Sequence, residues 1–290
     1  KEKLGGVCLN WGCIPTKALI KNAEVYSLIK HSEDYGIKVH NISVDFKKNV
    51  KRSRDISQRL SKGIEFLMKK NKIEHFSGTG SLKSKNSIEV KNDDKAYIVE
   101  AEKIIIATGA RPKTFPGLDF DSKNVISSKD AMLLTTPPKD LIIIGSGAIG
   151  VEFAYYFSEF GTKVHIVEMM DRILPNEDQD VSEELERNFK KSGMKIFKGM
   201  RVSKVQSMKQ SAKVFLEGKE IEKIIKAEKV LLAVGVTGNI DNLGLEDLGI
   251  EIETGAIKVD NFNRTNINNI YAIGDVCGPP WLAHVASAEG

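Results

Sequence analysis

The sequence LIIIGSGAIG at residues 141–150 decides the fold of this chain. Four consecutive apolar residues before the first glycine predict a strand that is buried on both faces, as the strands of parallel sheets are. An amphipathic stretch reaching about Phe160 predicts a helix, and residues 163–168 predict the next strand. A strand, a glycine turn, a helix and a strand in this order make a βαβ unit, which places the chain in the α/β class.

The spacing of the glycines suits a dinucleotide. Gly145 permits a tight turn, Gly147 lets the backbone approach a pyrophosphate, and Gly150 lets the helix pack closely on the strand, with the phosphates at the helix N-terminus. Glu168 ends the second strand, eighteen residues after Gly150. A carboxylate there would accept hydrogen bonds from ribose hydroxyls and repel a 2′-phosphate. We therefore expect NAD, although Arg172 leaves an opening for NADP, and an ordinary strand-to-helix turn stays as the alternative.

Two cysteines near the start of the chain, Cys8 and Cys13, have four residues between them. In an ideal helix such residues have Cα atoms about 8.6 Å apart, whereas a disulfide tolerates at most roughly 7 Å. A disulfide therefore needs a distorted helix, and Gly12 and Pro15 suit a loop that turns into a helix. The helix N-terminus and Lys17 would favour a thiolate. We interpret the pair as a redox disulfide. Two ordinary buried cysteines are the alternative, and zinc is disfavoured because no second Cys/His pair follows.

Composition excludes several classes of protein. A chain of 290 residues is long enough for two domains, and its 41% hydrophobic and 28% charged residues are ordinary for a soluble globular protein. No apolar run is long enough to span a bilayer, and the net charge of +4 is spread over stretches without interleaved aromatic residues, so we expect neither membrane nor nucleic-acid binding. Three cysteines do not make a disulfide scaffold. We therefore expect the protein to work in a reducing compartment, where a disulfide between Cys8 and Cys13 would be catalytic. We expect Cys277 to be a small buried side chain.

The remaining elements follow from periodicity and turn residues. Helices are predicted at residues 46–72 and 182–191, and strands at residues 73–76, 87–90, 96–99, 103–107, 195–197, 213–217, 229–234, 257–259 and 270–273. The strands before residue 100 predict a small antiparallel layer. Thr108-Gly109 and Gly274-Asp275 each follow an apolar strand, and an aspartate at such a strand end can bind a ribityl hydroxyl. This pairing suits a second nucleotide of the flavin type.

Together, these features resemble the flavin- and pyridine-nucleotide-dependent disulfide oxidoreductases. The sequence GGVCLNWGCIPTK at residues 5–17 is similar to the active-site motif of the family's dihydrolipoamide dehydrogenase branch, and Leu9 points away from the glutathione, trypanothione and mercuric reductase branches. The resemblance covers the whole chain, through Ala107-Thr108-Gly109, the glycine motif ending in Val151-Glu152, residues 265–275 and Ala283-His284. It implies an α/β fold of two nucleotide-binding Rossmann-like domains, for FAD and NAD, with a three-layer β/β/α architecture truncated at both ends.

The resemblance also implies roles for single residues. Cys8 would meet the substrate dithiol, Cys13 would contact the flavin, and Lys17 would lie near the flavin and pair with Glu152. The implied catalytic residues are Cys8, Cys13, Lys17 and Glu152. The residues implied to bind FAD or NAD are Gly5, Gly6, Lys17, Thr108, Gly109, Gly145, Gly147, Ile149, Gly150, Glu168, Gly235, Gly274, Asp275, Leu282, Ala283 and His284, and no metal is implied. The reaction would be oxidation of protein-bound dihydrolipoamide by NAD, with lipoyl domains of 2-oxoacid dehydrogenase or glycine cleavage complexes and a second copy of the chain as partners.

The chain departs from the family pattern at both ends. It has one GxGxxG motif only, which leaves no half-site for the ADP part of FAD, and no histidine followed by proline, which the family's C-terminal interface domain carries. We therefore expect an internal fragment, inactive alone, with a partial FAD-binding domain at residues 1–113, an NAD-binding domain at 114–236 and a return to the FAD and central region at 237–290. The alternatives are another FAD disulfide reductase, of mercuric or glutathione type, and a catalytically silent nucleotide-binding module. The expected location is a bacterial cytoplasm or a mitochondrial matrix.

Overall fold

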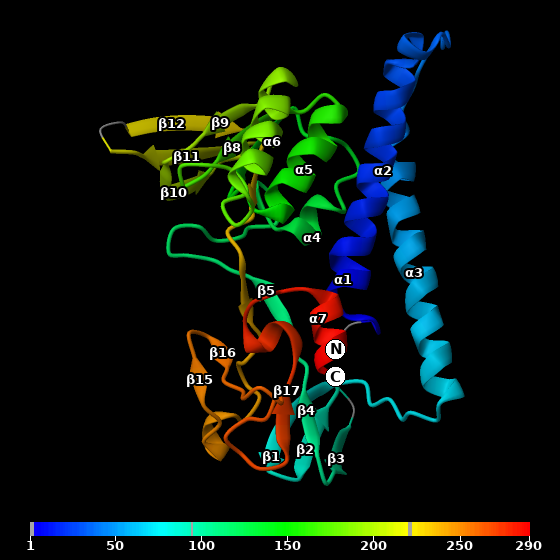
Figure 1. Cartoon of the computed structure of the whole chain (residues 1–290), viewed down its shortest axis with the longest axis vertical. Helices are drawn as coiled ribbons and strands as arrows, with labels where there is room; N and C mark the ends of the chain where they lie inside the picture. The colour runs from blue at the N-terminus through cyan, green and yellow to red at the C-terminus, as the bar shows by residue number, and fades with distance from the viewer. Residues whose placement is uncertain (1–2, 94, 220–221) are drawn as a thin grey trace. The chain divides into compact units, whose positions relative to one another are not determined.

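The computed structural model describes residues 3–93, 95–219 and 222–290. Its packing divides the chain into two compact units, each made of segments that are distant in sequence (Figure 1). The first unit combines the residues up to Cys8 with residues 61–111 and 236–290, and the second combines residues 9–60 with 112–235. Packing does not say what a unit binds, so the assignment of residues 1–113, 114–236 and 237–290 to FAD and NAD domains stays a prediction.

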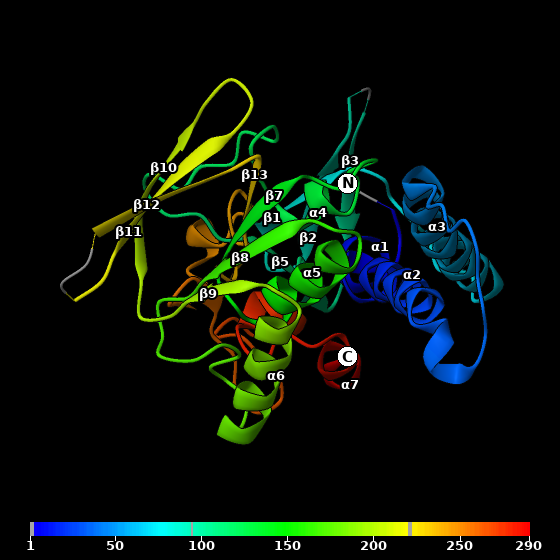
Figure 2. The ribbon, with the colours of Figure 1, turned by 90° about the horizontal axis from the view of Figure 1, so that it is seen from above.

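The second unit is built around a five-stranded sheet with the order β6-β13-β7-β8-β9, in which every neighbouring pair is parallel. The strands and helices of this region are β6 (Val125–Ile126), α4 (Ser128–Ala131), β7 (Asp140–Ile144), α5 (Ala148–Glu159), β8 (Lys163–Val167), α6 (Gln179–Lys191), β9 (Lys195–Phe197) and β13 (Lys229–Leu232). Figure 2 shows α5 and α6 along one side of this sheet. The predicted strand, helix and strand of the βαβ unit are therefore confirmed.

Strand β7 shows why the unit has three layers. Leu141 and Ile143 pack into the hydrophobic cluster that contains α5, whereas Ile142 and Ile144 pack into a separate cluster on the other face. All four side chains are at most 5% exposed. Because a strand alternates its side chains, a continuous apolar run can fill two cores at once. Burial of each such side chain stabilises the fold by about 1.5–3 kcal/mol.

The layer opposite the helices is an antiparallel sheet with the order β10-β11-β12, whose strands are β10 (Arg201–Ser207), β11 (Ala212–Glu217) and β12 (Glu222–Ala227). Ala212, Val214 and Leu216 alternate along β11 and are buried against the parallel sheet. This layer confirms the three-layer β/β/α prediction. Of its strands only β11 was predicted, because β10 and β12 mix charged residues with few apolar ones and carry no clear alternation.

Two long helices, α2 (Cys13–Lys30) and α3 (Phe46–Lys70), contribute to the helical side of the second unit. They run side by side where Asn22 Nδ2 donates to the carbonyl of Asn49 at 3.3 Å and Arg52 Nη1 donates to the carbonyl of Ala18 at 3.1 Å. Phe46, at the start of α3, packs on the aromatic rings of α5. Within the described residues, no helix is long and apolar enough to cross a membrane.

The first unit contains short strands around a smaller core. Its elements are β1 (Thr79–Ser84), β2 (Ser87–Lys91), β3 (Ala96–Glu100), β4 (Ile104–Ile106), β5 (Ala110–Pro112), β14 (Val236–Gly238), η2 (Glu246–Leu248), β15 (Ile252–Glu253), β16 (Ala256–Ile257), β17 (Ile270–Ala272), η3 (Gly274–Cys277) and α7 (Ala283–Glu289). Strands β1, β2 and β3 form the predicted antiparallel layer, and β4 pairs with β17 in parallel. The strand predicted at residues 73–76 is wrong. Ile73 is 53% exposed, and the first strand instead buries Leu82.

Candidate functional site

The two cysteines of the predicted redox pair, Cys8 and Cys13, are joined by a disulfide. Cys8 lies in a short helix, α1 (Gly6–Trp11), and Cys13 is the first residue of α2. Between the helices, Gly12 leaves the helical conformation with φ −136° and ψ −119°. The predicted distortion of the helix is therefore confirmed, whereas the loop expected before it is a short helix. A thiolate released at Cys13 would lie at the positive end of the α2 dipole.

Trp11 lies between the two cysteines in the sequence, and its indole ring makes cation–π contacts with two basic side chains. The Arg54 guanidinium of α3 and the Lys129 ammonium of α4 each lie 4.2 Å from the ring centroid. Desolvation by burial lowers the pKa of Arg54, but the guanidinium remains charged at neutral pH. Each contact contributes about 0.5–2 kcal/mol, so the end of α1 is fixed to two other elements. A lone tryptophan gave no signal of this role in the sequence.

The predicted ion pair between Lys17 and Glu152 is present. Lys17 Nζ lies 3.2 Å from Glu152 Oε1, and the two residues come from the neighbouring helices α2 and α5. The Lys17 side chain is 68% exposed, so the pair adds little to stability. Its structural effect is to fix the direction of the ammonium group. The catalytic roles implied for both residues stay predictions.

The glycine loop of the second unit is shaped by close backbone packing. A Cβ on Gly145, which has φ +96°, would lie 2.3 Å from the carbonyl oxygen of Ala233, and a Cβ on Gly150 would lie 2.1 Å from that of Gly145. At Gly147, by contrast, no heavy atom lies within 4 Å of the place of a Cβ, and this residue precedes the first turn of α5. The loop is therefore closed against its own sheet and open where a pyrophosphate would approach, so these residues fit a dinucleotide.

Glu168, expected at the ribose, makes contacts that the sequence did not reveal. Its side chain is buried, and Oε2 accepts hydrogen bonds from the Ser146 N–H at 2.8 Å and the Ser146 hydroxyl at 2.6 Å. Oε1 accepts the N–H of Met170 at 2.9 Å. The carboxylate therefore ties the glycine loop to the end of β8. The only sequence signal of this anchor was a hydroxyl residue between the two glycines.

Two other residues expected to bind a nucleotide lie at the same edge of the sheet. Gly235 has φ +98° and follows β13, two residues after Ala233, whose carbonyl faces Gly145. Ile149, in the first turn of α5, is 37% exposed although it is apolar. The carboxyl ends of β7 and β13 thus bring the glycine loop, Gly235 and Ile149 together, as expected for a ligand site in an open parallel sheet.

The first unit brings together the other pair of turns. Because β4 and β17 are parallel neighbours, Thr108-Gly109 and Gly274-Asp275 follow adjacent carboxyl ends. Desolvation by burial and the charge of Glu289 raise the pKa of Asp275. Glu289 Oε2 accepts the N–H of Gly274 at 2.6 Å. A half-buried carboxylate beside a like charge gains from hydroxyl donors, so this strand end fits the ribityl chain of a flavin.

The remaining predicted residues of this unit lie at the start of α7, which packs on η3, and at the start of α1. Leu282 is the N-cap of α7, and Ala283 and His284 lie in its first turn. A Cβ on Gly274 would lie 3.0 Å from the Ala286 Cβ, so α7 packs closely on η3. Gly5 and Gly6, with φ +106° and +67°, introduce α1.

Cys277 is the one cysteine outside the disulfide. It is half-buried, and burial together with the charge of Glu289 raises the pKa of its thiol to about 11. The thiol stays protonated at neutral pH and is a poor nucleophile. It is therefore distinct in chemistry from the pair at Cys8 and Cys13.

A dinucleotide loop and a disulfide in one chain are what a nucleotide-dependent disulfide redox protein requires. The comparison with protein families agrees. The family described as pyridine nucleotide-disulphide oxidoreductase matches residues 2–290, and the chain belongs to this family. Proteins of this family use FAD and a nicotinamide dinucleotide.

Similar proteins extend the comparison. The chain is 47% identical over 292 residues to a dihydrolipoyl dehydrogenase of Chlorobaculum parvum and 38% identical over 301 residues to one of Bacillus subtilis. The matches cover 100% of this chain and 62% and 64% of those relatives. Among solved structures, LpdA of Mycobacterium tuberculosis is similar with a TM-score of 0.92 and 26% identity, over 99% of this chain and 63% of that one. The flavoprotein disulfide reductase RclA of Escherichia coli is similar with a TM-score of 0.85 and 27% identity, over 99% of this chain and 61% of that one. The chain thus spans less than two thirds of the relatives it matches.

Proposed function

We propose that this chain is the redox and nucleotide-binding part of a dihydrolipoyl dehydrogenase, which oxidises protein-bound dihydrolipoamide and reduces NAD. The disulfide between Cys8 and Cys13, placed at the start of α2, carries this proposal. The relatives named dihydrolipoyl dehydrogenase support the choice of substrate.

The disulfide step follows from thiol exchange. A thiolate of the substrate attacks the sulfur of Cys8, the bond between Cys8 and Cys13 breaks, and Cys13 leaves as a thiolate. The second substrate thiolate then attacks the substrate sulfur of the mixed disulfide, which forms the cyclic lipoamide disulfide and releases Cys8 as a thiolate. Two electrons have passed from the substrate to the cysteine pair. Because Cys13 is the first residue of α2, its thiolate would lie at the positive end of the helix dipole and be stabilised there.

Bound FAD would accept this electron pair and NAD would be its final acceptor. In the first unit, Thr108, Gly109, Gly274 and Asp275 lie at adjacent strand ends and would hold the flavin nucleotide, together with Gly5, Gly6, Leu282, Ala283 and His284. In the second unit, Gly145, Gly147, Ile149, Gly150, Glu168 and Gly235 would hold NAD. The proposed role of Lys17, fixed by Glu152, is to present a positive charge to the flavin.

Partners belong to the same proposal. Lipoyl domains of 2-oxoacid dehydrogenase or glycine cleavage complexes would present the dithiol, and a second copy of the protein would complete a dimer. The name of the relatives, dihydrolipoyl dehydrogenase, supports the lipoyl group as substrate.

The test uses the full-length protein. Anaerobic titration with dihydrolipoamide, followed by addition of NAD, is expected to change the visible flavin spectrum and then to produce NADH. Cys13→Ser is expected to lower turnover more than about 1,000-fold, because no disulfide can form, and Cys277→Ser is the matched control that should retain activity. A protein whose flavin ignores dihydrolipoamide but responds to NADPH would contradict the proposal and indicate another disulfide reductase. A protein that purifies without flavin would indicate a silent nucleotide-binding module.

A further inference from the structure

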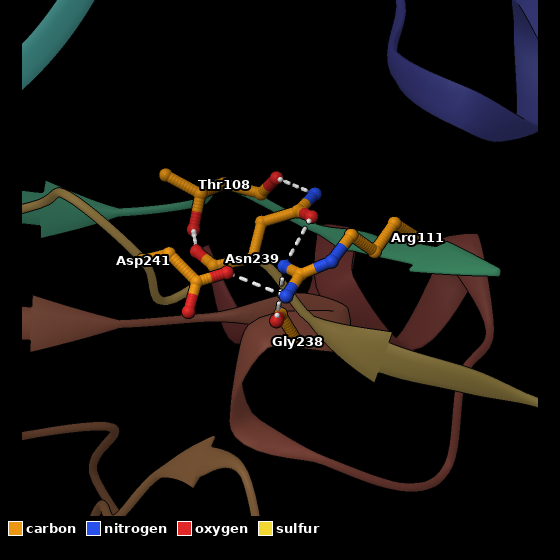
Figure 3. Close-up of polar contacts among 5 residues, drawn as sticks. All are labelled: Thr108, Arg111, Gly238, Asn239 and Asp241. Carbon is orange, nitrogen blue, oxygen red and sulfur yellow. Dashed lines mark hydrogen bonds and ion pairs between the residues drawn. The ribbon is translucent and has the colours of Figure 1, made fainter. Parts of the chain in front are cut away.

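The Thr108-Gly109 turn of the first unit is held by a single residue far along the chain (Figure 3). Thr108 Oγ1 donates to the carbonyl of Asn239 at 2.8 Å, and Asn239 Nδ2 donates to the carbonyl of Thr108 at 2.9 Å. The N–H of Asn239 donates to the carbonyl of Gly109, also at 2.9 Å. Both carbonyls of the turn are thus tied to a residue that lies 131 positions after Thr108.

Asn239 is itself fixed by a guanidinium group. Arg111 Nη1 donates to Asn239 Oδ1 at 3.2 Å and to the carbonyl of Gly238 at 3.1 Å, and Arg111 Nη2 donates to Asp241 Oδ2 at 2.5 Å. Because the oxygen of the amide faces Arg111, its nitrogen must face Thr108. We name these five residues, Thr108, Arg111, Gly238, Asn239 and Asp241, the Asn239 clasp.

The clasp decides which polar groups the turn can present to a ligand. Peptide carbonyls directed at the phosphates or ring carbonyls of a flavin nucleotide would repel them, and the clasp binds both carbonyls within the protein. The other side of the turn is open, since Gly109 has φ +70° and no heavy atom lies within 4 Å of the place of its Cβ. The strand end that carries Asp275 follows the neighbouring strand β17.

We propose that the Asn239 clasp positions the Thr108-Gly109 turn for flavin binding, with Asn239 as the central positioning residue and Arg111 and Asp241 as its supports. This inference rests on the proposed function, which assigns the turn to FAD. It adds three residues that none of the sequence motifs includes. The clasp acts through the turn and does not itself take part in electron transfer.

The experiment compares two asparagines of the first unit in the full-length protein. Asn239→Ala removes the amide donor to Thr108 and the acceptor for Arg111. Asn266→Ala is the matched control, because the Asn266 side chain also makes two hydrogen bonds, in its case both with backbone groups: it donates to Gly249 at 2.7 Å and accepts from Glu251 at 2.9 Å. The FAD dissociation constant is expected to rise about tenfold for Asn239→Ala, as loss of roughly one net hydrogen bond predicts, and to stay within about twofold for the control.

A second variant separates positioning from general loss of stability. Asn239→Asp keeps an acceptor for Arg111 but directs a carboxylate oxygen at the Thr108 carbonyl, so it should release FAD more readily than Asn239→Ala and should shift the visible circular dichroism of the bound flavin. Thr108→Val should weaken FAD binding by less.

The outcomes are distinct. If the wild-type protein binds FAD and both Asn239 variants bind it with an unchanged dissociation constant, or if Asn266→Ala weakens it equally, the clasp has no positioning role and this inference fails alone. If the wild-type protein binds no FAD, the proposed function fails and the inference fails with it.

Discussion

The glycine loop of the second unit and the Thr108-Gly109 turn of the first are held by different means. In the glycine loop, the backbone itself leaves no room for side chains at Gly145 and Gly150. The Thr108-Gly109 turn has open space beside it and is held by the Asn239 clasp. One loop is thus shaped by steric exclusion, from its own backbone at Gly150 and from the Ala233 carbonyl at Gly145. The other depends on hydrogen bonds from a distant segment, which solvent and substitution can weaken.

This difference decides what each loop tolerates. A steric constraint cannot be relaxed without moving the sheet, because a buried parallel sheet is close-packed. A clasp of partly exposed polar side chains can lose one member and keep the others. We therefore expect substitutions in the glycine loop to affect folding and substitutions in the clasp to affect ligand binding first.

The largest effect is expected at Gly150. In Gly150→Ala the new methyl group would lie 2.1 Å from the carbonyl of Gly145, so the loop or the start of α5 must shift, and the free energy of unfolding should fall by about 3 kcal/mol. Urea denaturation measures this change. Gly147→Ala is the control, since open space and φ −69° accommodate its methyl group. It should keep stability within about 0.5 kcal/mol while weakening NAD binding, and an equal loss of stability in both variants would refute the steric account.

A smaller loss is expected at Glu168. Glu168→Gln replaces the charged acceptor of the Ser146 and Met170 contacts, so stability should fall by about 2 kcal/mol. The ratio of NADP to NAD affinity should rise, because the charge that repels a 2′-phosphate is gone. Thermal unfolding and nucleotide titrations measure both changes. Glu184→Gln, at an exposed position on α6, is the control and should change neither quantity. If Glu168→Gln leaves the free energy of unfolding unchanged, the glycine loop does not need Glu168 as an anchor.

Substitutions in the Asn239 clasp should lower the free energy of unfolding by less than substitutions in the glycine loop. The Arg111 and Asp241 side chains are 46% and 59% exposed, so Asp241→Asn should lower the free energy of unfolding by under about 1 kcal/mol. Added salt should reduce the difference from the wild type, because it screens the exposed pair. Asp247→Asn, at another exposed position in the first unit, should show no salt-dependent difference. A loss as large as that of Gly150→Ala would remove the contrast between the two loops.

The smallest effect is expected at Asp275 and depends on pH. Burial and the charge of Glu289 raise the pKa of Asp275 above its usual 3.8, so the native state binds this proton more tightly than the unfolded state. Ionisation therefore costs stability at neutral pH, and Asp275→Asn should raise the melting temperature of the nucleotide-free chain slightly at pH 7. The gain should vanish below pH 3.8, where the carboxyl is protonated in both states.

An aspartate with the opposite shift is the control. Hydrogen bonds from the backbone N–H groups of Arg264 and Phe262 lower the pKa of Asp260. Asp260→Asn should therefore lower the melting temperature at pH 7, and the loss should shrink as the pH falls below 3.8. If both variants shift in the same direction, burial of Asp275 is not the cause of its behaviour.

The same contrast explains how much the sequence could predict. The glycine loop, β7 and α5 form one continuous segment, so their periodicity and glycine spacing were sufficient. The disulfide needed only the spacing of Cys8 and Cys13 and the glycine between them. These features depend on neighbours in sequence, which pattern reasoning describes well.

Features built from distant segments could not be read in this way. No pattern connects Arg111 with Asp241, or Trp11 with Arg54 and Lys129, because each contact depends on the final packing. Strand β10 was missed because its few apolar residues give no alternation. The strand expected near Ile73 is wrong because residues 73–76 have two polar residues between Ile73 and Phe76 and so do not alternate either. The glycine loop and Glu168 were both predicted to be parts of a nucleotide site, but the hydrogen bonds between Ser146 and Glu168 could be seen only in the structure.

The contacts of the Trp11 ring with Arg54 and Lys129 bear on the speed of the redox cycle. When the disulfide opens, α1 loses its cross-link to α2 and stays joined to it only through Gly12, and a helix of six residues has little stability of its own. The cation contacts do not involve the sulfurs, so we expect them to hold the indole ring, and with it the end of α1, in both oxidation states. We therefore expect the sulfurs to part and rejoin on a backbone that keeps its shape. We expect a small reorganisation energy for each cycle, with turnover limited by sulfur exchange and electron transfer and not by rebuilding of the loop.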